Sequence, residues 1–445
     1  MREETPRQRE ARRRRQKLLR QRQVRRQKIL LATGTVAAAG IVAIAAGISS
    51  FLHSRAERAA QETAAQQEAL LQEQQAAEEE KQRQEEEANT IHLLAVGDNL
   101  IHEKIYESGI QTDGTWNYDH LYTHVKDRIS QADLAAVNQE CIFVSDHDNV
   151  SAYPAFGAPM EVGDALVNAG FDIVESASNH TFDKGAQAIT DTIQYWQTNH
   201  PEISLLGIHD SQEAADTIST VTVKGVTFAL LNYTSQINGD AYDQFPSYMI
   251  DLLRAERVTE DVQKASQMSD MTIAFLHTGE EYSREPNQEQ KNFLQLLLSQ
   301  GVDIAICSHP HVLQNFETLR GDQGNEMLVY YSLGNFISTQ KEPECMLGGM
   351  ADITITVDDG TGNPAVSGSD LIPLVTHYNY DANEYTVYPL EDYTEELAAS
   401  HSIHQETTET FSLEYLQQTY QSVLKQTYDT LGTGGDTSGS GQSLT

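Results

Sequence analysis

The sequence has few cysteines, and its basic residues are concentrated at one end. Three cysteines among 445 residues, Cys141, Cys307 and Cys345, do not make a disulfide framework, and an odd number leaves one over. Because Cys141 and Cys307 stand in apolar segments, we interpret them as small buried hydrophobic residues. Residues 1–28 hold 13 of the 30 Lys and Arg residues and a net charge of +10; the whole chain carries −35, so the remainder carries −45. Such an acidic remainder repels polyanions, which argues against nucleic acid as a partner.

The change of charge coincides with an apolar run without charged residues, residues 29–52. A membrane-spanning helix needs roughly 20 apolar residues, whereas the apolar core of a secretory signal peptide has about 7–15. The Ala-rich composition leaves cleavage open, but the length favours a retained transmembrane helix. Under the positive-inside rule, residues 1–28 form a basic cytoplasmic tail and everything after Leu52 lies outside. We therefore predict a single-pass protein of the cell membrane; a nucleic-acid-binding arm on a cytosolic protein is the disfavoured alternative.

After the apolar run, the composition predicts a stalk, a large domain and a C-terminal segment. Residues 53–89 consist mainly of Ala, Gln and Glu, good helix formers that predict a solvated helical stalk. From residue 90 to about 392, apolar strands alternate with polar loops and amphipathic helices, which indicates an α/β domain with a largely parallel sheet. A helical segment, 393–431, precedes a Gly/Ser/Thr-rich tail, 432–445, that we expect to be disordered.

The individual elements follow from hydrophobic periodicity and turn residues. Antiparallel edge strands are expected at Ala351–Val357 and Tyr385–Val387, and a terminal helix at Leu413–Leu431. The other predicted strands are Ile91–Val96, Leu134–Val137, Ile173–Ser176, Ile203–Leu206, Thr227–Asn232, Met271–His277, Ile304–Cys307 and Met327–Ser332, and the other predicted helices are Gly163–Ala169, Gly185–His200, Ala255–Ala265 and Asn287–Gln300.

Polar side chains follow nearly every predicted strand directly. In open α/β sheets, ligands bind beyond the carboxyl ends of the strands. One histidine after a strand is more often a loop residue than a ligand, but six clusters at one edge indicate a site. Carboxylates and imidazoles suit Zn, Mn, Fe or similar divalent ions, and a carboxylate between two cations is the arrangement that hydrolyses phosphate esters. The clusters are Asp98; Asn138 and Glu140; Asn179, His180 and Asp183; His277, Glu280 and Glu281; His309 and His311; and Asn335.

The order of these motifs resembles the CapA family of poly-gamma-glutamate capsule synthesis proteins, a branch of the calcineurin-like metallophosphatase superfamily. The resemblance covers about residues 91–340 and implies a four-layer αββα sandwich with two metal ions at its edge. The segments that carry it are AVGDNLIH (95–102), AVNQECIF (136–143), SASNHTFDKG (176–185), FLHTGEEY (275–282), GVDIAICSHPHVLQNFE (301–317) and YYSLGNFI (330–337).

The resemblance also implies roles for individual residues. Asp98 matches the metal aspartate of the first strand, and Glu140 stands where the superfamily has its bridging aspartate. His180 matches the catalytic histidine that handles a proton. The remaining implied metal ligands are Asn179, His277, His309 and His311.

Two departures from the family pattern affect the first metal site. The superfamily has Asp-x-His at the first strand, whereas this chain has Leu100 at the histidine position, and His102 is a candidate substitute two residues later. Glu140 in place of aspartate lengthens the bridging arm by one methylene, so one metal site is expected to be weaker or differently filled. No nucleophile elbow or Cys–His pairing of known pattern is present.

Other residues near the motifs have simpler interpretations. Tyr330, Tyr331 and Phe336 are expected in the core around the last strand, and Asp183 is expected to cap or turn into the helix that begins near Gly185, rather than bind metal. Glu280 and Glu281 either line the substrate mouth or lie on a solvated loop. Lys184 and Arg284 are candidate receptors for an anionic substrate group.

Two functions are compatible with these observations. The first is an extracytoplasmic metal-dependent hydrolase of a phosphoester or of a bond in an envelope polymer. The second is a membrane-anchored assembly factor for capsule or poly-gamma-glutamate that binds the polymer or its membrane synthase without cutting it. A degenerate structural sandwich is a third, less favoured interpretation. The capsule role rests on the resemblance, because a fold does not by itself imply a function.

Overall fold

The computed structural model of the protein describes residues 17, 21, 39–358 and 360–431. The chain divides into two compact units, residues 1–84 and 85–445. A long helix, α2 (Ala39–Ala88), contains nearly all of the predicted stalk. Residues 29–38 of the predicted membrane span, most of the basic segment and the tail 432–445 lie outside the described residues. Within the described ranges, no helix combines the length and the apolarity that a membrane crossing requires.

The larger unit contains two principal β-sheets. The first has eight strands in the order β16-β15-β14-β1-β2-β5-β6, with β13 paired to β1 outside this path. Strands β1, β2, β5 and β6 run parallel, while β14, β15 and β16 pair antiparallel. Its strands are β1 (Thr90–Asn99), β2 (Leu134–Asn138), β5 (Ile173–Glu175), β6 (Ser204–Leu206), β13 (Asn335–Ile337), β14 (Leu347–Val357), β15 (Pro364–Asn379) and β16 (Glu384–Pro389).

The second sheet has six strands in the order β11-β12-β10-β9-β8-β7. Its four central strands are parallel and its two edge strands antiparallel. A separate small sheet pairs β3 (Phe143–Val144) with β4 (Ala158–Pro159). The six strands are β7 (Ser219–Val223), β8 (Val226–Thr234), β9 (Met271–His277), β10 (Ile304–Ser308), β11 (Phe316–Arg320) and β12 (Glu326–Tyr330).

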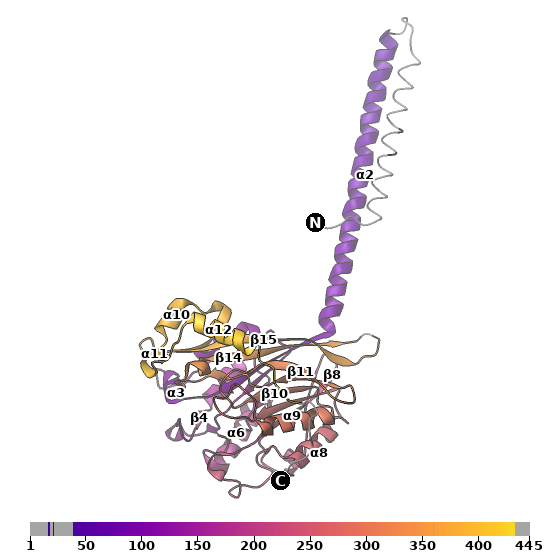
Figure 1. Ribbon diagram of the computed structural model, residues 1–445. Helices are drawn as coiled ribbons and strands as arrows, with labels where there is room; N and C mark the ends of the chain where they lie inside the picture. The colour runs from indigo at the N-terminus through magenta and orange to yellow at the C-terminus, as the bar shows by residue number, and fades with distance from the viewer. Residues whose placement is uncertain (1–16, 18–20, 22–38, 359, 432–445) are drawn as a thin grey trace. The chain divides into compact units, whose positions relative to one another are not determined.

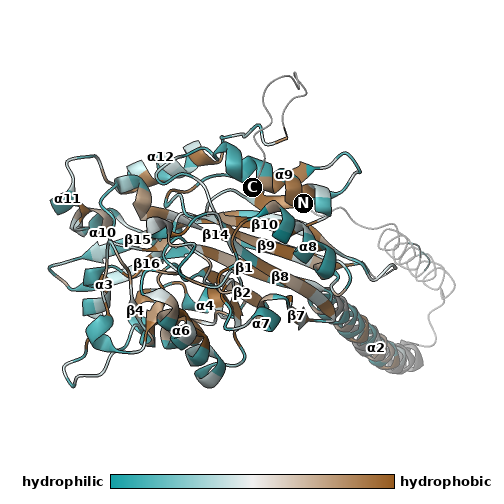
Figure 2. Ribbon diagram, turned by 90° about the horizontal axis from the view of Figure 1, so that it is seen from below, coloured by the Kyte–Doolittle hydropathy of each residue, from teal (hydrophilic) through white to brown (hydrophobic). Residues whose placement is uncertain are grey.

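Burial shows how the two sheets pack. Phe275 and Ile304 of the second sheet share one core cluster with Leu93 and Val137 of the first. The alternate residues of the second sheet, such as Leu276, pack instead against the helices α8 and α9. Figure 1 shows the two sheets, and in Figure 2 the hydrophobic central strands lie between α8 and α9 on one side and α4 and α6 on the other. The helices are α3 (Glu103–Ser108), α4 (Lys126–Ile129), α5 (Glu161–Ala169), α6 (Gly185–Asn199), α7 (Gln212–Ala215), α8 (Ala255–Ala265) and α9 (Gln288–Gln300).

The helix–sheet–sheet–helix order is the sandwich that the sequence motifs led us to expect, and local sequence explains its element boundaries. The Asn287 side chain accepts a hydrogen bond from the Gln290 backbone N–H and starts α9. Gly301 ends the same helix in the left-handed conformation, at φ +89°. Most predicted elements are confirmed within one or two residues, because buried apolar runs between turn signals leave little choice of boundary.

The prediction of edge strands was partly wrong. Strand β14 was expected at an edge, but it lies between β1 and β15. Its partner β15 was not predicted at all, although Pro364–Asn379 is the longest strand of the sheet. The first half of β15 is rich in small and polar residues, and none of its side chains before Leu371 is buried, so it lacks the apolar alternation of a sheet strand. Strand β16 does lie at the edge, as expected.

The C-terminal segment joins the core of the large unit. Helices α10 (Glu395–Ser400), α11 (Ile403–Glu406) and α12 (Leu413–Val423) contribute buried residues such as Leu416 to the main cluster. The predicted terminal helix is too long, since α12 ends at Val423. Beyond it, the Asn315 side chain donates to the backbone carbonyls of Leu424 and Gln426, which holds the chain in a non-helical course.

Candidate metal centre

The candidate site residues come together where the parallel strands of both sheets end. Asp98 lies near the end of β1, and Glu140 follows β2 by two residues. From the second sheet, His277 is the last residue of β9, and His309 follows β10 directly. The carboxyl ends of parallel strands from two packed sheets therefore meet at one edge. All seven candidates, Asp98, Glu140, Asn179, His180, His277, His309 and His311, are buried.

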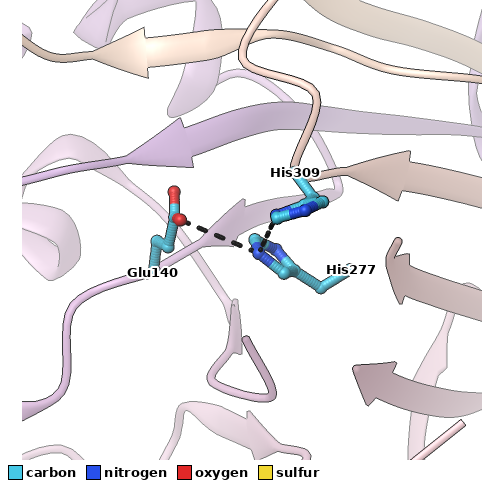
Figure 3. A group of neighbouring side chains, drawn as sticks. All are labelled: Glu140, His277 and His309. Carbon is cyan, nitrogen blue, oxygen red and sulfur yellow. Dashed lines mark hydrogen bonds and ion pairs between the residues drawn. The ribbon is translucent and has the colours of Figure 1, made fainter. Parts of the chain in front are cut away.

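One group combines two histidines with one end of the Glu140 carboxylate (Figure 3). The Nε2 atom of His277 lies 3.1 Å from Nδ1 of His309 and 3.7 Å from Oε1 of Glu140. The amide oxygen of Asn179 lies 2.8 Å from the same His277 nitrogen. Two imidazole nitrogens and two oxygens thus converge on a small volume, as in a site for a divalent cation.

The outward nitrogens of both histidines are held by other side chains. Nδ1 of His277 lies 3.1 Å from the Ser308 hydroxyl, and Nε2 of His309 lies 3.0 Å from the Gln236 amide. When the outer nitrogen carries the proton, the inner nitrogen keeps its lone pair for a ligand. The Ser308 hydroxyl can accept this proton from His277, whereas the Gln236 amide nitrogen faces His309 as a donor. Neither Ser308 nor Gln236 had been singled out from the sequence.

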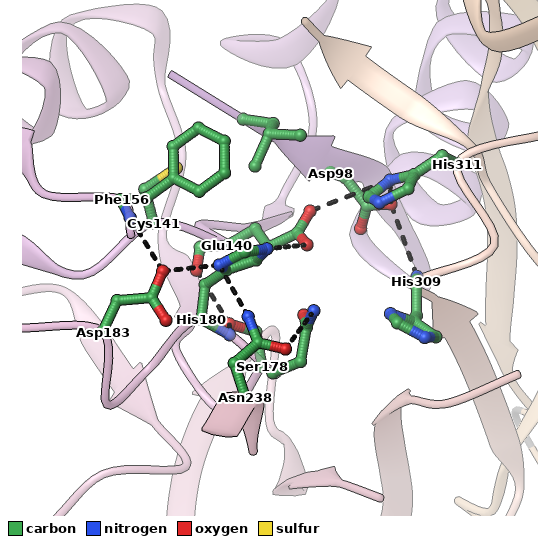
Figure 4. Close-up of polar contacts among 12 residues, drawn as sticks. Asp98, Glu140, Cys141, Phe156, Ser178, His180, Asp183, Asn238, His309 and His311 are labelled. Carbon is green, nitrogen blue, oxygen red and sulfur yellow. Dashed lines mark hydrogen bonds and ion pairs between the residues drawn. The ribbon is translucent and has the colours of Figure 1, made fainter. Parts of the chain in front are cut away.

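A second group shares Glu140 but is richer in oxygen. It consists of Asp98, Glu140 and His311. Nδ1 of His311 lies 3.0 Å from Oδ2 of Asp98 and 3.9 Å from Oε2 of Glu140. Figure 4 shows Glu140 between His180 on one side and the Asp98–His311 pair on the other. Glu140 therefore reaches one group with each of its two oxygens.

The surroundings of the Glu140 carboxylate show whether the site fits a metal ion. Among the described residues, nothing donates a hydrogen bond to either of its oxygens, although the side chain is fully buried. Burial raises the pKa of Glu140 to about 8, since a buried carboxylate without a partner is costly. Two orphaned oxygens facing histidine nitrogens on both sides fit divalent cations well.

The pKa values of the three site histidines follow from burial and nearby carboxylates. Burial lowers the pKa of His277 well below its usual value and that of His309 to about 4. Both are therefore neutral near pH 7, as ligands must be. Burial also works against charge on His311, but the carboxylates of Glu140 and Asp98 outweigh it and raise the pKa of His311 to about 9.

His180 stands beside the groups and is paired with Asp183. Its Nδ1 lies 2.6 Å from Oδ2 of Asp183, and its Nε2 faces Oε1 of Glu140 at 3.9 Å (Figure 4). Burial lowers the pKa of His180, but the Asp183 and Glu140 carboxylates outweigh it, so the pKa lies above its usual value. Of the two expectations for Asp183, the turn into the helix is confirmed and the cap is wrong: Asp183 lies in the turn before α6, whose N-cap is Lys184, and its carboxylate accepts from the Phe156 backbone N–H at 2.7 Å.

Similarity to known proteins identifies the family of the chain. Residues 92–340 match the family described as bacterial capsule synthesis protein PGA_cap. The chain belongs to this family. It is 24% identical over 338 residues to a capsule biosynthesis protein CapA of Bacillus anthracis, covering 71% of this chain and 79% of the relative. It is 30% identical over 178 residues to a PGA biosynthesis protein CapA of Bacillus subtilis, covering 39% of this chain and 44% of the relative.

The PGA_cap chain is also similar to a solved phosphoesterase structure, at low identity. The calcineurin-like phosphoesterase YfkN from Bacillus subtilis is 14% identical, with 76% of this chain and 98% of that chain covered and a TM-score of 0.37. A TM-score this low does not bear on the fold, which rests on the two sheets themselves.

In this PGA_cap chain, His102 does not replace the histidine absent at position 100. Among the described residues, it belongs to neither of the two ligand groups. Its Nδ1 accepts from the Thr339 backbone N–H at 3.2 Å, and its ring packs edge-on against Phe156. His102 thus packs beside the site without joining it.

The charged residues that the sequence places near the site differ in their exposure and in their partners. Glu280 and Glu281 are both exposed, and the Glu281 charge acts on Glu140 and His311. Lys184 donates to the Ser151 hydroxyl at 2.5 Å, and Arg284 pairs with Glu344. The charge of Arg284 is therefore paired within the chain, whereas Lys184 is bonded to a neutral hydroxyl.

The backbone at the His309–Pro310–His311 turn is held in an unusual conformation. His309 has φ +100° and His311 has φ +60°, in the left-handed region that non-glycine residues rarely adopt. Such residues cost about 1–3 kcal/mol each and cluster at functional sites. Here the strained turn directs one imidazole to each ligand group.

Proposed function

We propose that the protein is a membrane-anchored, extracytoplasmic metal-dependent phosphoesterase that acts in the biosynthesis of capsule or a related envelope polymer. The observation that carries the hydrolase proposal is the position of Glu140. Its two buried oxygens have no hydrogen-bond donor among the described residues, and each faces one group of candidate ligands. His180, 3.9 Å from Glu140, has the position of a proton-handling residue.

Two divalent ions, each Zn, Mn or Fe, fit the donor groups. Asp98, Glu140 and His311 would hold one ion; Glu140, Asn179, His277 and His309 would hold the other. When bound, divalent ions supply Lewis acidity to phosphoryl oxygens and lower the pKa of water.

The protein's own residues then position the proton that the leaving oxygen needs. Asp183 accepts from Nδ1 of His180, which orients the ring and favours its protonated form. The Nε2–H of His180 consequently points toward Glu140, where it donates to a leaving oxygen.

The family supports the cellular role, and the sequence supports the location. Membership of the PGA_cap family supports action on an envelope polymer or association with its membrane synthase. The uncharged run at residues 29–52 after thirteen basic residues supports a membrane anchor with the N-terminus in the cytoplasm. The predicted stalk, residues 53–89, would then follow the membrane span outside the cytoplasm.

Single engineered cysteines test the proposed topology, because all three native cysteines are buried and free. Ala59 is exposed in α2 after the apolar run, while Thr5 precedes the run. In intact cells, a membrane-impermeant maleimide should label Ala59→Cys and spare Thr5→Cys until the cells are lysed. Equal labelling of both positions in intact cells, or recovery in the soluble fraction, would contradict the anchor.

Metal content and hydrolysis test the proposed chemistry. The full-length protein should contain about two equivalents of Zn, Mn or Fe by elemental mass spectrometry and should hydrolyse bis-p-nitrophenyl phosphate. The double variant Asp98→Ala/His309→Ala should lose both properties. The matched control, Asp146→Ala/His147→Ala, removes an exposed Asp–His pair and should keep them. Retained metal without hydrolysis of any phosphoester tested would favour the polymer- or synthase-binding role instead.

A further inference from the structure

Asn335 lies against the oxygen-rich ligand group, although the sequence motifs placed it only at the edge of the site and assigned it no role as a ligand. Strand β13 pairs in parallel with β1, and in this register Asn335 lies opposite Asp98. The side chain is buried, and its Oδ1 lies 3.1 Å from Nδ1 of His311. The same His311 nitrogen is the one that faces Asp98 and Glu140.

The surrounding acceptors determine which way the Asn335 amide points. Its Nδ2 donates to Oε1 of Gln340 at 2.6 Å, to the Ser338 hydroxyl at 3.0 Å and to the Cys345 carbonyl at 3.2 Å. An amide nitrogen only donates, and an amide oxygen only accepts. Turning the amide over would place its oxygen against the Cys345 carbonyl, so Oδ1 must face His311.

A simple hydrogen bond from His311 does not account for this arrangement. Three oxygens from Asp98, Asn335 and Glu140 lie 3.0, 3.1 and 3.9 Å from one imidazole nitrogen. The one hydrogen of that nitrogen can be shared between Asp98 and Asn335, but it does not reach the Glu140 oxygen at 3.9 Å, which has no donor among the described residues. A nitrogen lone pair and three oxygens around one small volume match the coordination of a divalent cation.

We propose that Oδ1 of Asn335 is the fourth protein ligand of the Asp98–Glu140–His311 site and makes it selective for a hard divalent cation such as Mn²⁺. This proposal rests on the metal site of the proposed function. The group then offers three oxygens and one nitrogen, whereas the other offers the nitrogens of His277 and His309 with two oxygens. Carboxylate and carbonyl oxygens suit Mn²⁺ and Mg²⁺, and imidazoles suit Zn²⁺ and Fe²⁺. The two sites therefore select different ions.

Titration of the metal-free full-length protein with Mn²⁺ and with Zn²⁺ by calorimetry tests the proposal. The wild type should bind Mn²⁺ preferentially in one class of site and Zn²⁺ preferentially in the other, and bound Mn²⁺ should give an electron paramagnetic resonance signal. Asn335→Leu removes the oxygen at similar size and should weaken the Mn²⁺ class by about 10- to 100-fold, as for other lost metal contacts. The Zn²⁺ class should keep its affinity, while Asn179→Leu should show the reverse pattern.

Asn335→Leu also removes the three hydrogen bonds of Nδ2, so a second variant is needed as a control for their loss. Asn335→Asp keeps an oxygen toward the site and adds charge, so it should bind Mn²⁺ at least as tightly as the wild type. In an Asp98→Ala background, Asn335→Leu should cause no further loss of Mn²⁺ affinity, because that site is already broken.

Three results would overturn the proposal, and they are distinguishable. Wild-type Mn²⁺ affinity in Asn335→Leu would leave Asn335 as a mere hydrogen-bond acceptor for His311. A loss of Mn²⁺ binding in Asn335→Asp equal to that in Asn335→Leu would assign the effect to the lost Nδ2 contacts. If the two sites showed no preference between Mn²⁺ and Zn²⁺, the proposed selectivity would be contradicted, but the proposed hydrolase would not. If the wild type bound neither ion, both proposals would be contradicted.

Discussion

Nδ1 of His180 lies 2.6 Å from Oδ2 of Asp183, three residues further along the chain. The same carboxylate oxygen accepts from the Phe156 backbone N–H, and the Phe156 ring packs edge-on against His180. Asp183 is therefore fixed by the loop before β4, and it fixes His180 in turn. The orientation of His180, the proposed proton donor, therefore depends on contacts between segments that are distant in the chain.

Asp183→Asn should separate catalysis from binding. The amide still occupies the space but carries no charge, so the pKa of His180 should fall from its raised value, and the protonated form should be lost at lower pH. We expect turnover of bis-p-nitrophenyl phosphate to fall by about 10²-fold or more, with KM and metal content unchanged. Imidazole NMR measures the pKa of His180 independently of activity. The control Asp191→Asn changes a half-buried carboxylate outside the site that accepts from Ser145 and Gln187, and it should behave as wild type. Equal effects in both variants would contradict the pairing.

Glu140→Gln should make the metal-free protein, measured in EDTA, more stable than the wild type. Added metal should no longer stabilise the variant. The substitution removes a buried carboxylate that lacks a donor among the described residues, and we expect about 1–3 kcal/mol higher free energy of unfolding without metal. Thermal melting with and without Mn²⁺ or Zn²⁺ measures both effects. The control Glu326→Gln, at an exposed pair with Arg320, should shift stability by less than about 0.5 kcal/mol. A metal-free Glu140→Gln protein less stable than the wild type would show that Glu140 has a stabilising partner.

Stability should fall in mild acid because of His401, away from the metal site. Nδ1 of His401 accepts from the Ile403 backbone N–H at 3.0 Å, and burial lowers the pKa of this histidine to about 3. A depressed pKa means that its contribution is present above the unfolded value of about 6.5 and is lost as pH falls from there toward 3. Each pH unit in that window should cost about 1.4 kcal/mol for this residue.

The difference between wild type and His401→Asn isolates this effect. Asparagine can accept from Ile403 but does not titrate, so the free energy of unfolding of the variant should depend less steeply on pH between 6 and 4. Denaturant unfolding at several pH values measures the slope. His92→Asn, at an exposed position, is the control and should keep the wild-type slope; the same slope in His401→Asn would contradict the assignment.

Gly97→Ala should disrupt the site through the backbone. A Cβ atom at Gly97 would lie 1.9 Å from the Gly334 carbonyl oxygen, which also accepts from the Asp98 N–H. Strand β1 must therefore move away from the segment that carries Asn335, and we expect a loss of about 1–3 kcal/mol in stability with weaker metal binding. In the control Gly368→Ala, the new Cβ meets Thr354 at an ordinary 3.4 Å. Calorimetry and metal titration that show equal behaviour in the two variants would contradict the close approach.

The elements of the fold could largely be predicted from the sequence, and the failures have physical causes. Strand β9 was predicted with its observed bounds, because an apolar run ends at a polar cluster. Strand β15 was missed because its first half is rich in small and polar residues, and its strand conformation comes from pairing with β14. Tyr330, Tyr331 and Phe336 are buried, as expected for aromatic residues around an apolar strand.

The candidate site divides in the same way. Its residues Asp98, His277 and His309 could be named from the sequence because each follows an apolar strand. That Glu140 reaches both ligand groups could not, since the groups bring together residues from both sheets. Asp183 was assigned to a helix cap or turn because local sequence cannot distinguish a capping carboxylate from one that pairs with a histidine.

The sequence by itself determined the charge division, the strand–helix alternation and the chemical types of the donor groups, because these depend on composition and local periodicity. Only the tertiary structure decided which donors share a site. The register of β13 against β1 places Asn335 beside Asp98, over 200 residues away in the chain. The packing of the second sheet on the first places His277 beside Glu140. These contacts depend on the pairing of distant segments, which is governed by the burial of whole faces and not by the residues on either side of each motif.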